Sequence, residues 1–287
     1  MSPRPLWFLC GDGSATVTAV IDVRHTAHDD VVERAERALS VQLDRSSVVY
    51  GESGASESYR STAGTWVRIE RRNRQRAGGQ AWIGLEEAAT IPGVRKPSWF
   101  QSATWGDQER GVVWRADEVQ LITAPTVSDL DTALALPESW WAGLSSSLDQ
   151  LAAYSTTRIG MSQQHVTRRI TEVFGNGAGT TVDEWSTAHT DVHWDNVTTD
   201  GYLIDWEDWG RAPRGLDAAC LWQASLPVPE LAAQVRQVFA ADLDTRSGKL
   251  AMLLQAANAV RAAARLGAPT PLSGPARAAA DQLLAEL

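Results

Sequence analysis

The chain has 287 residues, of which 44% are hydrophobic and 21% charged, and its formal net charge is -9. This composition is ordinary for a globular protein with a sizeable core. The acidic balance argues against nucleic acid as the main partner, because binding its phosphates needs a basic surface. The two cysteines, Cys10 and Cys220, form no Cys-x-x-Cys pair, which argues against a zinc site or a disulfide framework. No apolar run approaches the ~20 residues of a membrane span, and the apolar patch near the start is too short for a secretion signal, so we expect a cytoplasmic protein with no membrane partner.

The first 124 residues are expected to alternate between helices and short strands. Apolar side chains recur with helical spacing in two segments, and runs rich in β-branched residues between polar turns indicate strands. In chain order, the expected elements are a helix over 28–43, strands over 47–50 and 65–70, a helix over 80–89, and strands over 111–114 and 119–123 with polar residues 116–118 between them. A loop of small residues at 51–60 separates the first two strands. Its backbone N–H groups could approach a phosphate, although a plain hairpin is the alternative and the Gly-Lys-Ser/Thr ending of a Walker A loop is absent.

From residue 128 onward the chain is expected to be mainly helical, because apolar side chains repeat with helical spacing between prolines and glycines. The expected helices contain 141–151 and 166–174 and, after a polar stretch, cover 216–226, 230–242, 248–266 and 274–287. We interpret these apolar stripes as core packing. Tryptophan occurs 13 times. Trp206 is expected in the core, whereas Trp194 and Trp209 could either fill the core or wall a pocket for a ring or a cation.

The most informative stretch combines acids, an amide and histidines. It contains Ala-His-Thr-Asp-Val-His-Trp-Asp-Asn-Val at 188–197 and Leu-Ile-Asp-Trp-Glu-Asp at 203–208. Residues 198–201, Thr-Thr-Asp-Gly, are expected to form a hairpin turn, because Asp-Gly supplies the positive φ angles of such turns. The hairpin would return Asp205 to Asn196, and one Mg²⁺ ion, which prefers hard oxygen ligands, could then contact both. The alternative is a polar hairpin with ordinary turn acids.

The motif resembles that of a known family. His-x-Asp-x-His-x-x-Asn over 189–196, followed by Ile-Asp-Trp-Glu, is similar to the catalytic core of the aminoglycoside phosphotransferase family, within the larger protein-kinase-like and choline-kinase-like group. Residues 212–217, Ala-Pro-Arg-Gly-Leu-Asp, are similar to the family's Asp-Pro-x-x-Asp segment. Thr190 and Val192 depart from the family pattern, in which Gly and Leu are common. The close match covers residues 185–220.

The resemblance implies an α+β, bilobal protein-kinase-like fold, with a small mixed N-lobe built on an antiparallel sheet and a larger, mainly helical C-lobe. We accordingly place a nucleotide-binding lobe at residues 1–124 and a catalytic and substrate-binding lobe at 125–287. The resemblance also implies that ATP, or another nucleoside triphosphate, binds in the cleft together with Mg²⁺.

The site residues that the family pattern implies lie mainly in the second lobe. Asp191 would orient the acceptor hydroxyl and take its proton late, while Asn196 and Asp205 would bind Mg²⁺. Three residues would support them, two by tying the catalytic loop to the helix beneath it and the third by bracing the loop: His189, Asp217 and His193. Three more are candidates for contact with the substrate, and the first of them could instead reach a second metal ion: Glu207, Asp208 and Trp209.

For the nucleotide, the resemblance points to the strand over 65–70, where related proteins place a cation on the α- and β-phosphates. No lysine lies on this strand, so Arg68 is the first candidate and Arg71 the second. An acid of the next helix would pair with this arginine. We favour Glu86, since adjacent acids point about 100° apart on a helix and only one can reach. The remaining candidates contact phosphates from the loop or adenine from the hinge: Ser53, Gly54 and Ser56 in the loop, and Leu121 and Thr123 at the hinge.

We therefore expect a small-molecule kinase that transfers a phosphoryl group from ATP to an alcohol. The resemblance and the net acidity favour a cationic acceptor such as an aminoglycoside-like antibiotic or an amino sugar, and choline- or homoserine-type metabolites are alternatives because a fold does not choose its acceptor. The rival class is a nucleotide-binding pseudokinase with a sensor or scaffold role. The arginine in place of lysine and the unusual Thr190 favour it, and the intact Asp191, Asn196 and Asp205 argue against it. A protein kinase ranks last, because the 12 positions from Asp205 to Asp217 leave no room for a peptide-docking loop.

Overall fold

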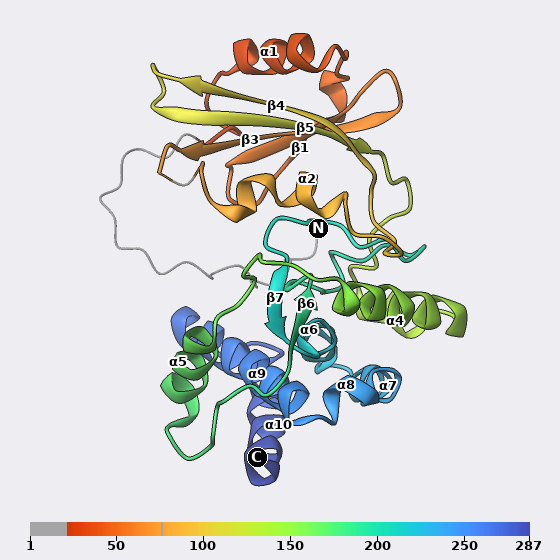
Figure 1. Ribbon diagram of the computed structural model, residues 1–287, viewed down its shortest axis with the longest axis vertical. Helices are drawn as coiled ribbons and strands as arrows, with labels where there is room; N and C mark the ends of the chain where they lie inside the picture. Colours follow the sequence, from red (N-terminus) through yellow and green to blue (C-terminus); the bar gives the residue numbers. More distant parts are fainter. Residues whose placement is uncertain (1–21, 76) are drawn as a thin grey trace. The chain divides into compact units, whose positions relative to one another are not determined.

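The computed structural model describes residues 22–75 and 77–287, which fold into two compact units (Figure 1). Among the described residues, the smaller unit holds 22–90 and 96–124, and the larger unit holds 91–95 and 125–287. The short segment 91–95 belongs to the larger unit because it pairs with that unit's backbone. The Arg95 carbonyl accepts a hydrogen bond from the Leu203 N–H at 2.9 Å.

A five-stranded antiparallel sheet forms the core of the smaller unit, in the strand order β1-β2-β3-β5-β4. Its strands are β1 (Val49–Tyr50), β2 (Ser56–Arg60), β3 (Thr65–Asn73), β4 (Trp99–Asp107) and β5 (Val112–Gln120). Burial alternates along β3, so Val67 and Ile69 face one side of the sheet and Arg68 faces the other. Helix α1 (Asp29–Leu39) covers the side of Val67 and Ile69, where its apolar stripe packs with Trp114 of β5 (Figure 1).

Strands β4 and β5 differ from the expectation. The sequence predicts two short strands separated by the polar residues 116–118, whereas the structure has one continuous strand there and a further strand, β4, before it. Two acids lie buried inside β5 because each has a partner. Asp117 accepts from the Arg115 guanidinium at 2.6 Å, and Glu118 accepts from the Thr65 hydroxyl at 2.6 Å. Hydrogen-bonded polar groups are tolerated in a buried strand, and a hydrophobic pattern does not reveal such pairing.

The helical connections of the smaller unit are short. A 3₁₀ turn covers Arg45–Ser47, and the helix expected over 80–89 begins as a 3₁₀ turn (Gln80–Ile83) before it becomes α2 (Gly84–Ala88). Short helices of this kind gain their stability from packing rather than from their own propensity.

The larger unit is mainly helical and contains one two-stranded antiparallel sheet. Its elements are α3 (Leu130–Leu134), α4 (Glu138–Ala153), α5 (Gln163–Phe174), β6 (Trp185–Ala188), β7 (Gly210–Pro213), α6 (Leu216–Ser225), α7 (Pro229–Val238), α8 (Ala240–Leu243), α9 (Arg246–Leu266) and α10 (Ser273–Glu286). Helices α5, α6 and α10 pack against the long α9 (Figure 1). All 10 residues of α6 are buried, as expected of a helix surrounded by other elements. The protein is thus of the α+β class, and among its described helices none has the length and apolarity to cross a bilayer.

Candidate active site

The polar stretch between β6 and β7 contains the hairpin that the sequence predicts. The Ile204 N–H donates to the Asn196 carbonyl at 3.0 Å, which joins the two arms. In the turn only Gly201 has a positive φ, of 86°, so the expectation of a second positive angle at Asp200 is wrong. The arms nevertheless bring Asp205, the residue after Ile204, to the arm that carries Asn196.

The side chain of Asn196 fixes that of Asp191. Its amide nitrogen donates to the Asp191 backbone carbonyl at 3.0 Å and to the carboxylate Oδ2 at 3.1 Å. Because both partners are acceptors, the nitrogen must be the end of the amide that faces them, and the Asn196 Oδ1 is left for another ligand. Asn196 is buried, whereas 38% of the Asp191 side chain is exposed. The carboxylate that would meet an acceptor is therefore open to solvent.

His193 lies beside the Asp191 carboxylate, with 3.6 Å between Nε2 and Oδ2. Its Nδ1 accepts a hydrogen bond from the Asp195 backbone N–H at 3.3 Å. Burial opposes charge on Asp191, but the His193 imidazole and the Asn196 amide outweigh it and hold the pKa of this carboxyl below its usual range. Burial also opposes charge on His193, and the Asp191 carboxylate raises the pKa of the imidazole in spite of it. Asp191 is thus ionised at neutral pH, as a proton acceptor must be.

Asp217, in the first turn of α6, holds the start of the loop that follows β6 and contains His189 and Asp191. Its two carboxylate oxygens accept from the backbone N–H groups of His189 and Thr190, each at 2.8 Å. Burial raises the pKa of Asp217 to about 7, while the two N–H groups favour its ionised form. The structure therefore places Asp217 where a tie between loop and helix was expected.

His189 joins the loop to the second arm of the hairpin. Burial lowers the pKa of His189 to about 4, so the ring is neutral. Its Nε2 lies 3.0 Å from the Ile204 carbonyl and, facing an acceptor, must carry the proton. The ring also packs edge-on against Trp206, with 4.6 Å between centroids. Trp206 is 1% exposed and fills the core beneath the loop, as predicted.

Two non-glycine residues of the site have a left-handed backbone conformation. Thr190 has a φ of 75° and Asp205 a φ of 69°. Each such residue costs about 1–3 kcal/mol, and such residues persist where the surrounding contacts leave the chain no alternative, often at functional sites. The Thr190 hydroxyl contacts the Asp208 carbonyl at 3.3 Å, and its methyl group lies where a side chain at Gly160 would be.

The donor set on the hairpin fits Mg²⁺. The exposed Asp205 carboxylate and the Asn196 Oδ1 are hard oxygen donors carried by two hydrogen-bonded arms. Among the described residues no group of three or more His, Cys, Asp or Glu side chains could hold a metal ion. A Mg²⁺ ion here would therefore take two protein ligands and complete its coordination shell with phosphate oxygens and water, as Mg²⁺ usually does in phosphoryl-transfer sites.

Trp209, one of the residues expected to contact the substrate, lies in the core instead of on the surface. It is 2% exposed and packs against the buried Arg158, whose Cζ lies 4.5 Å from the ring centroid. It belongs to the core, and its expected role at the substrate is wrong. Trp194 is likewise buried, in a cluster with other tryptophans. Asp208 is exposed and Glu207 is partly buried, and a contact between either and a substrate stays a prediction.

The structure separates the two arginine candidates on β3. Arg71 is 7% exposed and lies on the face that α1 covers, so it does not suit a phosphate. Arg68 lies on the other face, opposite Asp117 of β5. Glu86 of α2 forms its ion pair with Arg115, at 2.9 Å, and the expected pairing of Glu86 with Arg68 is wrong. Arg115 projects from the same face of the adjacent strand as Arg68. Because Arg115 is buried, leaving its charge without a carboxylate partner would be strongly destabilising, which favours its pairing with Glu86.

The loop between β1 and β2 folds as a tight hairpin. The Gly54 N–H donates to the Gly51 carbonyl at 3.0 Å, and the Ala55 N–H donates to the Ser53 hydroxyl at 3.3 Å. Ser56 is buried inside β2 rather than in the loop. Since these N–H groups are satisfied within the loop, the plain hairpin that the sequence left as an alternative describes it better than an open phosphate cradle.

The positions expected at the hinge follow β5 directly. Leu121 is partly buried and Thr123 is exposed, in a segment without regular structure. Backbone groups leave no side-chain signature, so a contact between these residues and a base stays a prediction.

Two buried arginines matter to these arrangements and were not anticipated, Arg158 and Arg115. For Arg115 a signal exists, since charges two positions apart on a strand share a face. For Arg158, in a loop without periodicity, the sequence offers none.

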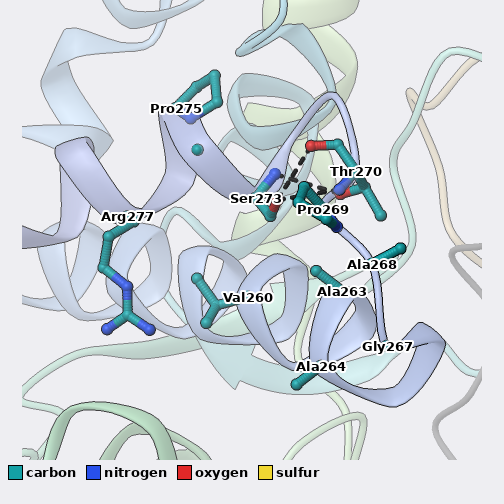
Figure 2. Close-up of a pocket in the computed structure, with 11 residues that line it drawn as sticks. Val260, Ala263, Ala264, Gly267, Ala268, Pro269, Thr270, Ser273, Pro275 and Arg277 are labelled. Carbon is teal, nitrogen blue, oxygen red and sulfur yellow. Dashed lines mark hydrogen bonds between the residues drawn. The ribbon is translucent and has the colours of Figure 1, made fainter.

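An open hollow of about 600 Å³ lies elsewhere in the larger unit, between the end of α9 and the start of α10 (Figure 2). Alanines, prolines and glycines line most of it, with Arg277 and the hydrogen-bonded Thr270 and Ser273 as polar groups, and it includes no residue of the candidate site.

Comparisons with known proteins agree with this site. Residues 163–253, about a third of the chain, match the model of the Phosphotransferase enzyme family. Among solved structures, an amicoumacin kinase in complex with AMP-PNP, Ca²⁺ and Ami is 12% identical with a TM-score of 0.55, covering 91% of this chain and 95% of that chain. The aminoglycoside phosphotransferase APH(3'')-Id from Streptomyces rimosus, in complex with ADP and streptomycin, is 12% identical with a TM-score of 0.52, covering 83% and 99%. A choline/ethanolamine kinase family protein from Mesorhizobium loti is 13% identical with a TM-score of 0.50, covering 90% and 92%.

The comparison with curated proteins found no match. At the identities above, the solved structures establish the fold alone, which is protein-kinase-like. The matched segment contains the whole motif from His189 to Asp217. The resemblance of this chain to the aminoglycoside phosphotransferase family is therefore confirmed.

Proposed function

We propose that the protein is a phosphotransferase that moves the γ-phosphoryl group of ATP, with Mg²⁺, to a hydroxyl group of a cationic small molecule. One observation carries the proposal, the connected geometry of Asp191, Asn196 and Asp205. The Asn196 amide donates to the Asp191 carboxylate at 3.1 Å, and the Asn196 carbonyl accepts from the residue before Asp205 at 3.0 Å. Phosphoryl transfer needs positioning and charge neutralisation more than covalent chemistry. This arrangement would position the hydroxyl at Asp191 and hold the Mg²⁺ ion that neutralises phosphate charge.

Each residue of the set has a defined task in the proposed reaction. The acceptor oxygen forms a bond to the γ-phosphorus while the bond to the ADP oxygen breaks, and the proton of the hydroxyl passes to the Asp191 carboxylate. Asn196 and Asp205 would hold Mg²⁺, which neutralises phosphate charge when bound. His193 keeps Asp191 ionised, and Asp217 holds the loop backbone through its two N–H contacts.

On the smaller unit we propose Arg68 as the residue that contacts the phosphates. Arg68 lies on central β3 on the face opposite α1, 26% of its side chain is exposed, and Glu70 of the same strand lies 3.6 Å away. Arg72 shares this face but pairs with Glu70 and lies over the Trp82 ring. A guanidinium offers a planar fork for phosphate oxygens. A cytoplasmic location, where ATP and Mg²⁺ are available, belongs to the same proposal.

A cationic acceptor is supported by charge. The chain carries a net charge of -9, and the exposed Asp208 adds a carboxylate near the hairpin besides the proposed metal ligand Asp205. The charge of the protein therefore favours a positively charged ligand. The solved relatives include complexes with streptomycin and with kanamycin. The choline/ethanolamine kinase family relative makes a smaller amino alcohol the alternative acceptor.

The test is ADP release from ATP and Mg²⁺ in the presence of single acceptors. The panel should contain aminoglycosides, amino sugars, choline and ethanolamine, with deaminated analogues of the same size as controls. We expect acceptor-dependent ADP release from one amine-bearing class and its loss in the deaminated partner. Turnover with neutral acceptors alone would contradict the cationic preference. Binding of Mg²⁺-ATP with no turnover across the panel would contradict the catalytic assignment and favour a pseudokinase.

A further inference from the structure

The metal-side residue Asp205 has a backbone that needs support from its neighbours. Its φ of 69° is unfavourable for a residue with a side chain. Its side chain is exposed, so packing of that side chain does not impose the conformation. The residues on either side have backbone groups that are held by specific partners, and these contacts restrain the conformation of Asp205.

On the upstream side the partners are already part of the candidate site. The His189 Nε2 contacts the Ile204 carbonyl at 3.0 Å, and the Ile204 N–H donates to Asn196. The residue before Asp205 is thus held at both its own N–H and its own carbonyl.

On the downstream side the Thr190 hydroxyl contacts the Asp208 carbonyl at 3.3 Å, and the buried side chain of Arg158 holds the carbonyls on either side of it. The Arg158 Nη2 donates to the Glu207 carbonyl at 2.8 Å and its Nε donates to the Trp209 carbonyl at 2.9 Å. The guanidinium also lies over the Trp209 ring, with Cζ 4.5 Å from the centroid. Arg158 is 6% exposed. A planar, permanently charged fork that contacts two carbonyls two residues apart fixes both their positions and their orientation, which a lysine does less well.

Arg158 is itself held in register with this segment. Its backbone carbonyl accepts from the Arg211 N–H at 2.9 Å, and the Gly160 N–H donates to the Arg211 carbonyl at 3.1 Å. The two chains approach so closely that a Cβ at Gly210 would lie 2.5 Å from the Gly160 nitrogen. The arginine therefore acts from a backbone that cannot shift independently of residues 207–211.

We propose that Arg158 is a positioning residue that holds Asp205 in the orientation required to bind Mg²⁺. The inference rests on the proposed function, because it concerns the same metal. In this role Arg158 would contact neither the metal nor the acceptor. It acts through the Glu207 and Trp209 carbonyls, and with His189 it brackets the strained residue from both sides.

The test compares wild type with Arg158→Met, Arg158→Lys and a matched control, Arg211→Met. Arg211 is an exposed arginine of the adjoining strand that stacks on Trp185, so its loss removes a similar side chain without touching the Glu207 and Trp209 carbonyls. The first measurement is calorimetric binding of AMP-PNP at a series of Mg²⁺ concentrations. The second is amide hydrogen exchange of residues 205–210 in the metal-free protein, which requires no turnover.

If Arg158 positions Asp205, Arg158→Met raises the Mg²⁺ concentration for half-maximal AMP-PNP binding by about 10–100-fold, the usual effect of losing a group that orients a ligand. It also accelerates exchange over 205–210 but not in α9. Arg158→Lys recovers part of both effects, and Arg211→Met resembles wild type. A lower melting temperature with unchanged Mg²⁺ dependence would show a merely structural role and overturn the inference, as would equal exchange over 205–210. If the AMP-PNP affinity of the wild type did not depend on the Mg²⁺ concentration, the proposed function and this inference would both be overturned. If the Arg158 variants alone had an altered Mg²⁺ dependence, the proposed function would stay intact.

Discussion

Replacing Asp217 by alanine should destabilise the larger unit, because two backbone donors lose their acceptor. The His189 and Thr190 N–H groups each donate to Asp217 at 2.8 Å. His189 is 1% exposed, so water cannot replace the lost carboxylate there, whereas Thr190 is only half-buried. An unsatisfied buried donor costs about 1–3 kcal/mol. Removing the buried carboxylate also recovers some desolvation, and we therefore expect Asp217→Ala to lower the free energy of unfolding by about 1–3 kcal/mol.

Urea unfolding followed by tryptophan fluorescence measures this difference, because tryptophans pack near the loop. The slope of free energy against urea should stay unchanged while the midpoint falls. Asp281→Ala, at an exposed position of α10, is the matched control and should stay within about 0.5 kcal/mol of wild type. A loss below about 0.5 kcal/mol in Asp217→Ala would refute the reasoning that this carboxylate anchors the catalytic loop.

Three further predictions follow from the site. Asp205→Ala should weaken nucleotide binding in the presence of Mg²⁺ and leave the weak metal-free binding unchanged, as calorimetry would show; an equal loss in both conditions would exclude a metal role. Trp209→Ala should lower the free energy of unfolding by about 3–5 kcal/mol in a denaturant titration, because it empties a buried site. A selective rise in acceptor KM at unchanged stability would instead return Trp209 to the pocket. Burial lowers the pKa of His189 from 6.5 to about 4, so its neutral form favours folding fully above pH 6.5, and this advantage is lost as the pH falls towards 4. The stability lead of wild type over His189→Gln should therefore shrink by about 2 kcal/mol between pH 7 and pH 5, and a lead that is independent of pH would contradict a neutral, buried ring.

The local features of the site were accessible from the sequence because they depend on residues close together in the chain. The hairpin that returns Asp205 to Asn196 follows from a turn with Gly201 at its tip, and the Asn196 contact to Asp191 spans only five positions. The two-residue periodicity of β3 was also predictable in principle, and it would have separated Arg68 from Arg71, since alternate residues face opposite sides.

Features that depend on distant partners were not predictable in this way. The acids of β5 resemble a polar break between two strands until their partners are known, and Glu86 pairs with Arg115 through a sheet register that no single sequence reveals. Arg158 lies 49 positions from the Glu207 carbonyl that it contacts. Trp209 could not be assigned to core or pocket until Arg158 was found beneath it. In each case the deciding interaction is a buried polar contact between separate segments, and hydrophobic patterning does not record such contacts.

Comparison of Asp191→Asn with wild type tests most directly whether this loop performs phosphoryl transfer. The measurement pairs the rate of ADP release, with the acceptor that gives turnover, with the affinity for Mg²⁺-AMP-PNP. We predict a fall in turnover of about 10²–10⁴-fold, because asparagine cannot accept the proton of the hydroxyl, with nucleotide affinity nearly unchanged because the Asn196 and Asp205 oxygens remain. Turnover equal to wild type would contradict the assignment of Asp191 and, with it, the account of the site.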